Sequence, residues 1–592
     1  KTVIHVTVFS LPDPNTTDTF SRANLETVKL FKKRFPHIFA EKYAAKYMAD
    51  PGKYGKHNWN NVEIQLHAFS GIQVQGVESD LLAIAGGMAP DLLYINFRKS
   101  DNYIRNGFLY PLDEYFETLP KAEQDLRIHP RLWEVVKRKG PDGKSHYWTM
   151  PYGSALGKLL MYRKDIFRKN NIPLPTIDWT WNELLEAAKK ISDPGKGLYG
   201  MMSFCNGYQF TTFLWSAGGD VMLYDEPSDE WKCTFNTPQV TEALDFFIRL
   251  NTEKWIGKDG AVNRGYTSQV NPDWSSNFEK WNRGEIGMML GYIDEKSYAS
   301  INPELVGMIP APIGPGGHRA SELNSTMYGI FSQITEPAVR DAVWEYMLFT
   351  DSREATVFRT KLLVEGGMAN FVKPKFLEMA GYPELVKYAP KGYDEIYRIA
   401  FETGKPEPYG KNSNFAYQML DIPLQKAMAL SLSDKLPEDR TERLKVMQKI
   451  LDESCARANE VMIGKISPED KVKRRAVAAL VLLLIVITFG FVIRNIFKLF
   501  TPPQTSGKVV TWGFRKYWVS YLMLFPAVAS ILVWSYTPIV QGTSMAFYNY
   551  KIIGKSVFIG LDNFGDILFD SFWWNAVWNS IRYCFTMLSL TF

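Results

Sequence analysis

The sequence has little cysteine, little histidine and no strong charge of either sign. Its 592 residues contain 4 Cys and 7 His, and 68 Lys and Arg nearly balance 63 Asp and Glu, which leaves a net charge of +5. So few cysteines exclude a disulfide-rich scaffold and a multi-cysteine metal cluster. So small a net charge on a long chain gives no reason to expect a nucleic-acid partner.

Motifs that would indicate an enzyme are also lacking. Gly554-Lys555-Ser556 resembles the end of a phosphate-binding loop, but Asn549 stands where the first Gly is required. Ser216 lacks the Gly two positions earlier that a nucleophile elbow needs, no HExxH motif occurs, and the His residues have no ligand spacing. We therefore expect no enzyme, no cofactor and no metal. A sugar-processing enzyme stays open as an alternative, and it would need two carboxylates facing each other at about 5–9.5 Å.

The first 465 residues alternate between the strand period of 2 and the helix period of 3.6, which is typical of an α/β fold. The length of the whole chain, at about 150 residues per domain, suggests three or four structural units. The spacing of Thr180 and Glu183 predicts a capping box at a helix start. The predicted strands are Val3–Phe9, Val62–Phe69, Asp91–Ile95, Lys158–Tyr162 and Gly287–Leu290. The predicted helices are Asn24–Met48, Val74–Ala85, Thr180–Ile191, Gln239–Leu250, Glu336–Thr350 and Arg440–Ile463.

Aromatic residues are what the sequence has in abundance: 17 Trp, 30 Tyr and 37 Phe, or 14% of the chain. In the first 465 residues many stand beside Gly, Pro or Asn, as Tyr152, Tyr208 and Tyr328 do. Tyr and Trp offer a flat apolar face with a polar edge, and a sugar ring has the matching character. The pattern indicates a carbohydrate site, although any single aromatic residue is more often an ordinary core or surface residue.

The last part of the chain reads as membrane-spanning. Ala476–Ile493 is a run of 18 residues without a charge, which is near the minimum for crossing a hydrocarbon core of about 30 Å. A second apolar stretch covers Trp518–Val540, and a third begins near Ala576. We expect residues 466–516 to hold an anchor helix (476–493) and a cytoplasmic linker, and the chain to cross a membrane in several passes.

Basic residues give the expected orientation. Five of them follow the first apolar run (Arg494, Lys498, Lys508, Arg515 and Lys516), which places that segment in the cytoplasm and residues 1–465 outside it. Four basic residues before the run argue the other way (Lys471, Lys473, Arg474 and Arg475). At the ends of the chain, Lys1–Ser10 already has a strand pattern, and Tyr583–Phe592 stops inside an apolar run. We expect both ends to be cut from a longer protein.

Residues 1–465 resemble the extracellular solute-binding proteins of sugar ABC transporters, the maltose-binding-like family. About eight stretches match in the family's order; they include Leu82–Ile95, Gly107–Tyr115, Met150–Phe167, Asn171–Leu185, Ser216–Asp220, Phe235–Leu250, Phe278–Gly291 and Tyr328–Ser352. The resemblance implies a two-lobed α/β binding-protein fold of the periplasmic type II class, with crossings near 155–158 and 308–313 and the ligand in a cleft between the lobes.

The same resemblance, with the positions at strand ends, suggests which residues bind the ligand. They are Phe9, Ser10, Asn96, Tyr152, Trp215, Trp274, Tyr292, Asp294, Ser325 and Tyr328. Trp274 rests on composition alone, and a loop carboxylate such as Asp294 is more often simply solvated.

Residues 517–592 resemble the N-terminal part of a MalF-type sugar permease. The matching segments are Tyr521–Tyr550, Phe558–Phe564 and Phe572–Ser580. The family's cytoplasmic coupling loop, which docks on the ATPase subunit, does not occur before the chain ends.

These observations together predict a carbohydrate receptor fused to the start of its own permease in a binding-protein-dependent ABC importer. The expected partners are a sugar or oligosaccharide ligand, a second permease subunit, cytoplasmic ABC ATPase subunits and the lipid bilayer. The resemblance implies that this bilayer is the bacterial inner membrane. The alternative is a membrane-anchored extracytoplasmic sugar sensor with remnant permease helices.

Overall fold

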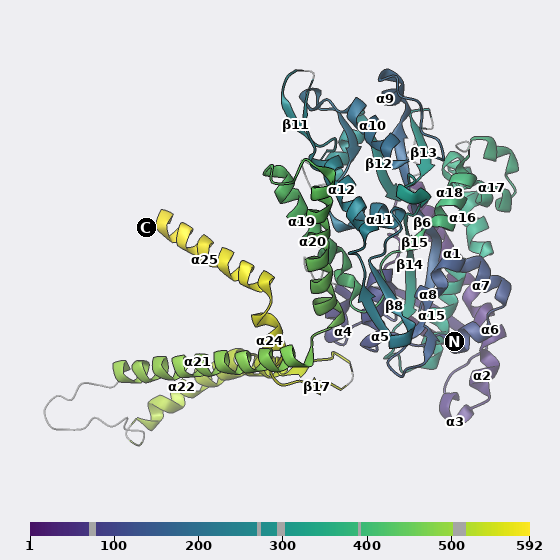
Figure 1. Cartoon of the computed structure of the whole chain (residues 1–592). Helices are drawn as coiled ribbons and strands as arrows, with labels where there is room; N and C mark the ends of the chain where they lie inside the picture. Colours follow the sequence, from purple (N-terminus) through teal and green to yellow (C-terminus); the bar gives the residue numbers. More distant parts are fainter. Residues whose placement is uncertain are drawn as a thin grey trace. The chain divides into compact units, whose positions relative to one another are not determined.

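The computed structural model describes residues 1–592 except 70–78, 258, 269–273, 293–301, 303, 389–391, 501–514, 516, 554 and 592. The chain forms two compact units, Lys1–Gly464 and Lys465–Phe592. Figure 1 shows the elements of both.

The first unit is built on one nine-stranded sheet. Along its main path the strands lie in the order β2-β1-β3-β14-β6-β12-β7, with β13 paired to β6 and β15 paired to β14. The strands are β1 (Thr2–Val8), β2 (Val62–Ala68), β3 (Leu92–Ile95), β6 (Met150–Arg163), β7 (Tyr199–Met202), β12 (Ile286–Tyr292), β13 (Val306–Pro310), β14 (Glu322–Ile330) and β15 (Lys405–Pro406). Short hairpins are formed by β4 (Lys137–Lys139) and β5 (Ser145–Tyr147), by β8 (Met222–Asp225) and β9 (Glu230–Cys233), and by β10 (Lys254–Ile256) and β11 (Val262–Arg264).

Helices follow most of these strands. In the first half of the unit they are α1 (Thr19–Lys42), α2 (Ala44–Met48), α3 (Pro51–Tyr54), α4 (Ser79–Ala85), α5 (Phe97–Arg105), α6 (Asp113–Thr118), α7 (Lys121–Arg127), α8 (Trp133–Val136), α9 (Lys164–Lys169) and α10 (Trp181–Ile191). The later ones are α11 (Gly207–Ser216), α12 (Pro238–Thr252), α13 (Trp274–Arg283), α15 (Pro337–Thr350), α16 (Arg353–Glu365), α17 (Pro374–Ala380), α18 (Tyr393–Thr403), α19 (Ala416–Leu432) and α20 (Arg440–Ala458).

The predicted strands and helices agree with these elements to within a few residues in most cases. The capping box is present: the Thr180 hydroxyl accepts from the Glu183 N–H, and the Glu183 carboxylate accepts from the Thr180 N–H. The predicted helix over Asn24–Met48 begins earlier and is divided at Tyr43 into α1 and α2. Part of the predicted helix Val74–Ala85 falls outside the described residues.

The sheet continues through two lobes because two of its strands run from one to the other. Met150–Tyr152 of β6 pairs with the Thr326–Tyr328 end of β14, which also pairs with β3 in the first lobe. Farther along β6, Leu159–Tyr162 pairs with β12 and β13 in the second lobe. The register of β6 against β14 shifts between Asn324 and Thr326, so β6 is irregular where it passes between the lobes.

The second predicted crossing is corrected by these pairings. Residues 308–313 begin within β13, which pairs with β6 entirely inside the second lobe. The strand that joins the lobes is β14, because it pairs with β3 at one end and with β6 along its length.

The two faces of the second-lobe sheet are covered by different helices. On one side, α11, α12, α19 and α20 enclose a core that contains Phe210, Phe213 and Phe247. On the other side, α18 packs through Ala400 on Leu159 and Met161 of β6. Polar side chains of both crossing strands come together where the two lobes meet.

The second unit is mostly helical. Its elements are α21 (Pro468–Phe500), α22 (Trp518–Ile531), the π-helix η9 (Leu532–Tyr536), α23 (Thr537–Met545), β16 (Tyr548–Asn549), β17 (Val557–Phe558), α24 (Asp562–Leu568) and α25 (Ser571–Thr591). Among the described residues, Pro468–Leu499 and Trp518–Met545 are long and apolar enough to cross a membrane, judged by length and composition. The π-helix lies just before Pro538, whose missing N–H interrupts the regular helical hydrogen bonds.

Candidate functional site

One face of β14 carries the candidate site. Side chains alternate across a strand, so Glu322, Asn324, Thr326 and Tyr328 lie on the same face. Asn324, Thr326 and Tyr328 are partly exposed, whereas the residues between them are buried on the opposite face. The face therefore runs from the second lobe at Glu322 to the first lobe at Tyr328.

The first-lobe end of this face is aromatic. Tyr328 pairs with Tyr94 across the β14–β3 ladder, and its ring centre lies 4.7 Å from that of Tyr152. The Tyr94 ring in turn stacks on Phe9 at 5.4 Å. Tyr94 and Thr326 also share a hydrogen bond, 3.3 Å between their hydroxyl oxygens. We call Phe9, Tyr94, Tyr152 and Tyr328 the aromatic row.

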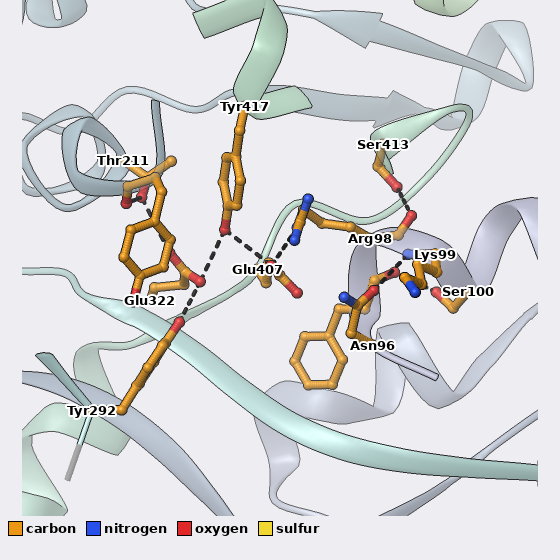
Figure 2. Close-up of polar contacts among 12 residues, drawn as sticks. Asn96, Arg98, Lys99, Ser100, Thr211, Tyr292, Glu322, Glu407, Ser413 and Tyr417 are labelled. Carbon is orange, nitrogen blue, oxygen red and sulfur yellow. Dashed lines mark hydrogen bonds and ion pairs between the residues drawn. The ribbon is translucent and has the colours of Figure 1, made fainter. Parts of the chain in front are cut away.

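The second-lobe end of the face is charged and buried. Glu322 accepts hydrogen bonds from Lys158 Nζ (2.7 Å), Thr211 Oγ1 (3.3 Å) and the hydroxyls of Tyr292 and Tyr417, the last at 2.9 Å. Figure 2 shows Thr211, Tyr292 and Tyr417 around the Glu322 carboxylate. The Glu322 and Lys158 side chains are 0% and 1% exposed.

A second carboxylate, Glu407, belongs to the same group. Its Oε1 accepts from Arg98 Nε at 2.5 Å and from the Tyr417 hydroxyl at 3.1 Å. The Arg98 guanidinium carbon lies 4.4 Å from the centre of the Tyr417 ring, a cation–π distance. We call Arg98, Lys158, Tyr208, Thr211, Tyr292, Glu322, Glu407 and Tyr417 the Glu322–Glu407 cluster.

Burial sets the protonation of the cluster. Burial, and next the Glu322 carboxylate, raise the pKa of the Tyr292 and Tyr417 hydroxyls well above the ordinary value, so both remain donors at neutral pH. Burial lowers the pKa of the Lys158 ammonium, and the adjacent Glu322 opposes this. Burial and the nearby Glu322 raise the pKa of Glu407, whereas Arg98 opposes the rise. Lys158 also lies over the ring of Tyr208 at 3.6 Å and donates to the Tyr208 carbonyl.

The predicted site residues are only partly brought together. Phe9, Tyr152 and Tyr328 lie in the aromatic row, and Tyr292 lies in the Glu322–Glu407 cluster. Asn96 is the N-cap of α5: its side chain accepts from the Lys99 N–H, and Arg98 follows two residues later. Figure 2 includes Asn96 beside this cluster.

The other five predicted residues belong to neither the aromatic row nor the Glu322–Glu407 cluster as the structure describes them. Trp215 is 2% exposed and lies in the second-lobe core, where its indole N–H donates to Asp220, so the structure places it apart from the aromatic row and the Glu322–Glu407 cluster. Ser325 is buried on the opposite face of β14, and its hydroxyl donates to the Thr326 carbonyl. Ser10 is exposed after β1. Trp274 is the first residue of α13, and Asp294 lies outside the described residues.

Several members of the site were not predicted from the sequence. Glu322 lies on a strand that was not predicted. Arg98 lies more than 300 residues before Glu407 and Tyr417, and the three residues share no short motif. Tyr208 follows Asn206-Gly207, and this position could have indicated a site residue. Many other aromatic residues of the chain stand in such positions, so it does not single out Tyr208. Among the described residues, no group of three or more His, Cys, Asp and Glu side chains is placed to hold a metal ion.

The fold is that of a two-lobed periplasmic-type binding protein. Residues 40–355 match the family of bacterial extracellular solute-binding proteins. The match covers more than half of the chain, and the chain belongs to this family. Its members are binding proteins, which agrees with the prediction that the chain is not an enzyme, and the family places the matched domain outside the cytoplasm.

One solved structure shares the fold, and a second matches the chain less well. An ABC substrate-binding protein from Listeria monocytogenes, in complex with cycloalternan, has a TM-score of 0.51 and 19% sequence identity; the match covers 78% of this chain and 99% of that one. The GacH receptor of Streptomyces glaucescens, solved without ligand and with acarbose, has a TM-score of 0.49 and 16% identity, and covers 79% and 100% of the two chains. None of the curated proteins matches the chain in sequence.

Proposed function

We propose that the chain captures a carbohydrate outside the cytoplasm and passes it to a permease that begins in the same polypeptide. The observation that carries this proposal is the single face of β14, on which an aromatic row adjoins a cluster of fixed hydrogen-bonding groups. Aromatic faces match the C–H faces of a sugar ring, and the polar cluster matches its hydroxyl rim. The Listeria structure with cycloalternan, which shares the fold, supports carbohydrates as the first class to test.

Two lobes joined by crossing strands suit a receptor. Hinge closure around a ligand changes the outer surface of such a protein, so a partner can recognise the loaded state. The irregular pairing of β6 with β14 between the lobes is a reasonable place for the hinge.

The permease part of the proposal rests on the resemblance of residues 517–592 and on the two helices that could span a membrane. A receptor joined to its permease does not have to reach it by diffusion. A short linker can hold the receptor at an effective concentration near the millimolar range around the permease. A second permease subunit and cytoplasmic ABC ATPase subunits would complete the importer.

Ion pairs in the second unit support two successive membrane crossings. Asp562 of α24 binds Lys471 Nζ (3.0 Å) and Arg475 Nη2 (2.9 Å) at the start of α21, and Asp566 lies 3.5 Å from Arg474. Three of the four basic residues that argued against the proposed orientation are thus paired with carboxylates. The same pairs require the start of α21 and the segment after Met545 to lie on one side of a membrane, as two successive crossings would give.

Calorimetric titration of the full chain, held in lipid nanodiscs, tests the ligand class. Neutral mono- and oligosaccharides would be titrated beside free amino acids of similar size. Saturable binding of a saccharide with no binding of amino acids is the expected result. Binding of amino acids alone would contradict the proposal.

Thiol labelling in intact cells tests the orientation separately. In a Cys584→Ser background, a cysteine at Ser556 should react with an impermeant reagent added outside, and a cysteine at Ser506 should not. The reverse pattern would invert the orientation and would remove the basis for an extracytoplasmic receptor in this chain.

A further inference from the structure

The two carboxylates of the Glu322–Glu407 cluster differ in how many hydrogen bonds they accept. Oε1 of Glu322 accepts from Tyr292 and Tyr417, and Oε2 accepts from Lys158 and Thr211. An ionised carboxylate has about four acceptor positions. Glu322 therefore has no position left for a ligand, and its role is to hold four neighbouring side chains in place.

Glu407 is only half satisfied. Both of its bonds, from Arg98 and Tyr417, end on Oε1. Its Oε2 is buried and receives no hydrogen bond from any of the residues that the structure describes, and the residue is 2% exposed. Buried polar atoms without a partner are uncommon in folded proteins, so this oxygen calls for a donor. Figure 2 shows it on the Asn96 side of the carboxylate, away from Tyr417.

The charges of the cluster already balance. Lys158 pairs with Glu322, and Arg98 pairs with Glu407. A cationic ligand would find no uncompensated negative charge there, and an anionic ligand would meet a carboxylate oxygen that cannot donate. The donor that fits is therefore neutral, and a sugar hydroxyl is such a donor.

We propose that Oε2 of Glu407 is the acceptor for a hydroxyl of a neutral polyhydroxylated ligand, and that Glu322 is a positioning residue. This inference rests on the proposed function, because it uses the same face of β14. It adds a selection by charge: neutral saccharides are taken in preference to uronates and amino sugars.

Substitution of Glu407 by Gln gives a sharp test, because the remaining bonds fix the orientation of the new amide. Arg98 and Tyr417 both donate, so the amide oxygen must occupy the Oε1 position and the NH₂ group must occupy the position of Oε2. The variant therefore converts the free acceptor into a donor with almost no change in shape. Hydrogen bonds to charged groups are among the stronger ones, so we expect at least tenfold weaker saccharide binding.

The measurement is calorimetric titration of the full chain in nanodiscs with a neutral saccharide that binds, and with its uronate and amino analogues. Glu365→Gln, at an exposed position at the end of α16, is the matched control and should leave binding unchanged. Binding of the neutral saccharide within twofold of wild type in Glu407→Gln would overturn the inference and leave the proposed function standing. Failure of every saccharide to bind the wild type would instead overturn the proposed function.

The wild-type chain supplies a second test that needs no variant. The neutral saccharide should bind more tightly than either charged analogue. Equal or tighter binding of the uronate or of the amino sugar would overturn the inference even if Glu407→Gln does not fold.

Discussion

The two units of the chain differ in which side chains they bury and which they expose. The first unit buries ions, since Lys158 and Glu322 are 1% and 0% exposed and lie in contact. The second unit exposes apolar side chains, with Met523 at 80% and Trp534 at 79%. Buried ions are tolerated in water-soluble folds only when each is paired and hydrogen-bonded, whereas exposed apolar side chains on long helices suit a hydrocarbon solvent.

The comparison shows why charge matters differently in each unit. In the first unit, the ions lie where the two lobes join, and their hydrogen bonds set the geometry of the candidate site. In the second unit, the charges of Lys471, Arg474 and Arg475 lie at a helix start and pair with α24. The variants below would break these arrangements one at a time.

The largest expected effect is on the buried ion pair. Lys158→Ala should lower the free energy of unfolding of the first unit by about 3–5 kcal/mol, because it leaves the Glu322 carboxylate buried without its cation. Denaturant unfolding followed by tryptophan fluorescence measures this. Lys29→Ala, which removes an exposed pair with Glu26, should cost about 0–1 kcal/mol. If the two variants lower the free energy of unfolding equally, the buried pair contributes no more to stability than the exposed one.

A smaller effect is expected where α24 packs on α21. A Cβ at Gly565 would lie 3.0 Å from the Arg474 Cβ and 3.3 Å from its backbone, whereas a Cβ at Gly542 would meet nothing within 4 Å. Gly565→Leu should therefore destabilise this contact by about 1–3 kcal/mol, and Gly542→Leu should not. Hydrogen exchange of the full chain in detergent should be faster in α24 for the first variant only. Unchanged exchange in Gly565→Leu would contradict the packing described here.

The smallest effect is expected in the aromatic row. Tyr94→Ala should weaken saccharide binding by about 0.5–1.5 kcal/mol, which is roughly two- to twelvefold in Kd, because one stacking face is lost. Tyr94→Phe keeps the ring and should bind within about twofold of wild type. Titration calorimetry distinguishes them. If the two variants bind equally, the ring of Tyr94 does not contact the ligand.

The sequence predicts the regular parts of the fold better than the site. Strands β1, β2 and β3 were predicted within about two residues because apolar residues alternate or cluster there. Strand β14 was not predicted, because the alternate residues of Glu322–Ile330 that face the site are polar or aromatic and the segment resembles a loop. The helix α11 is buried along almost its whole length, so its sequence gives no exposed face by which a core residue such as Trp215 could be told from a site residue.

The remaining site residues depend on tertiary structure. Arg98, Glu322, Glu407 and Tyr417 come together only when α5, β14, β15 and α19 have packed, and no spacing in the sequence joins them. Tyr292 could be predicted because it lies at the end of a predicted strand, and strand ends are where such folds bind ligands. Tyr328 was predicted from the family resemblance, since its own strand was not predicted. Trp215 was predicted from the family resemblance, and the structure places it in the core of the second lobe.

Hydrogen exchange of the full chain with and without a saturating neutral saccharide tests the central claim most directly. The account predicts slower exchange at Glu322–Ile330 and at residues 405–417, with no change in α21 to α25. Saturated binding with no protection on β14, or with protection confined to the second unit, would contradict it.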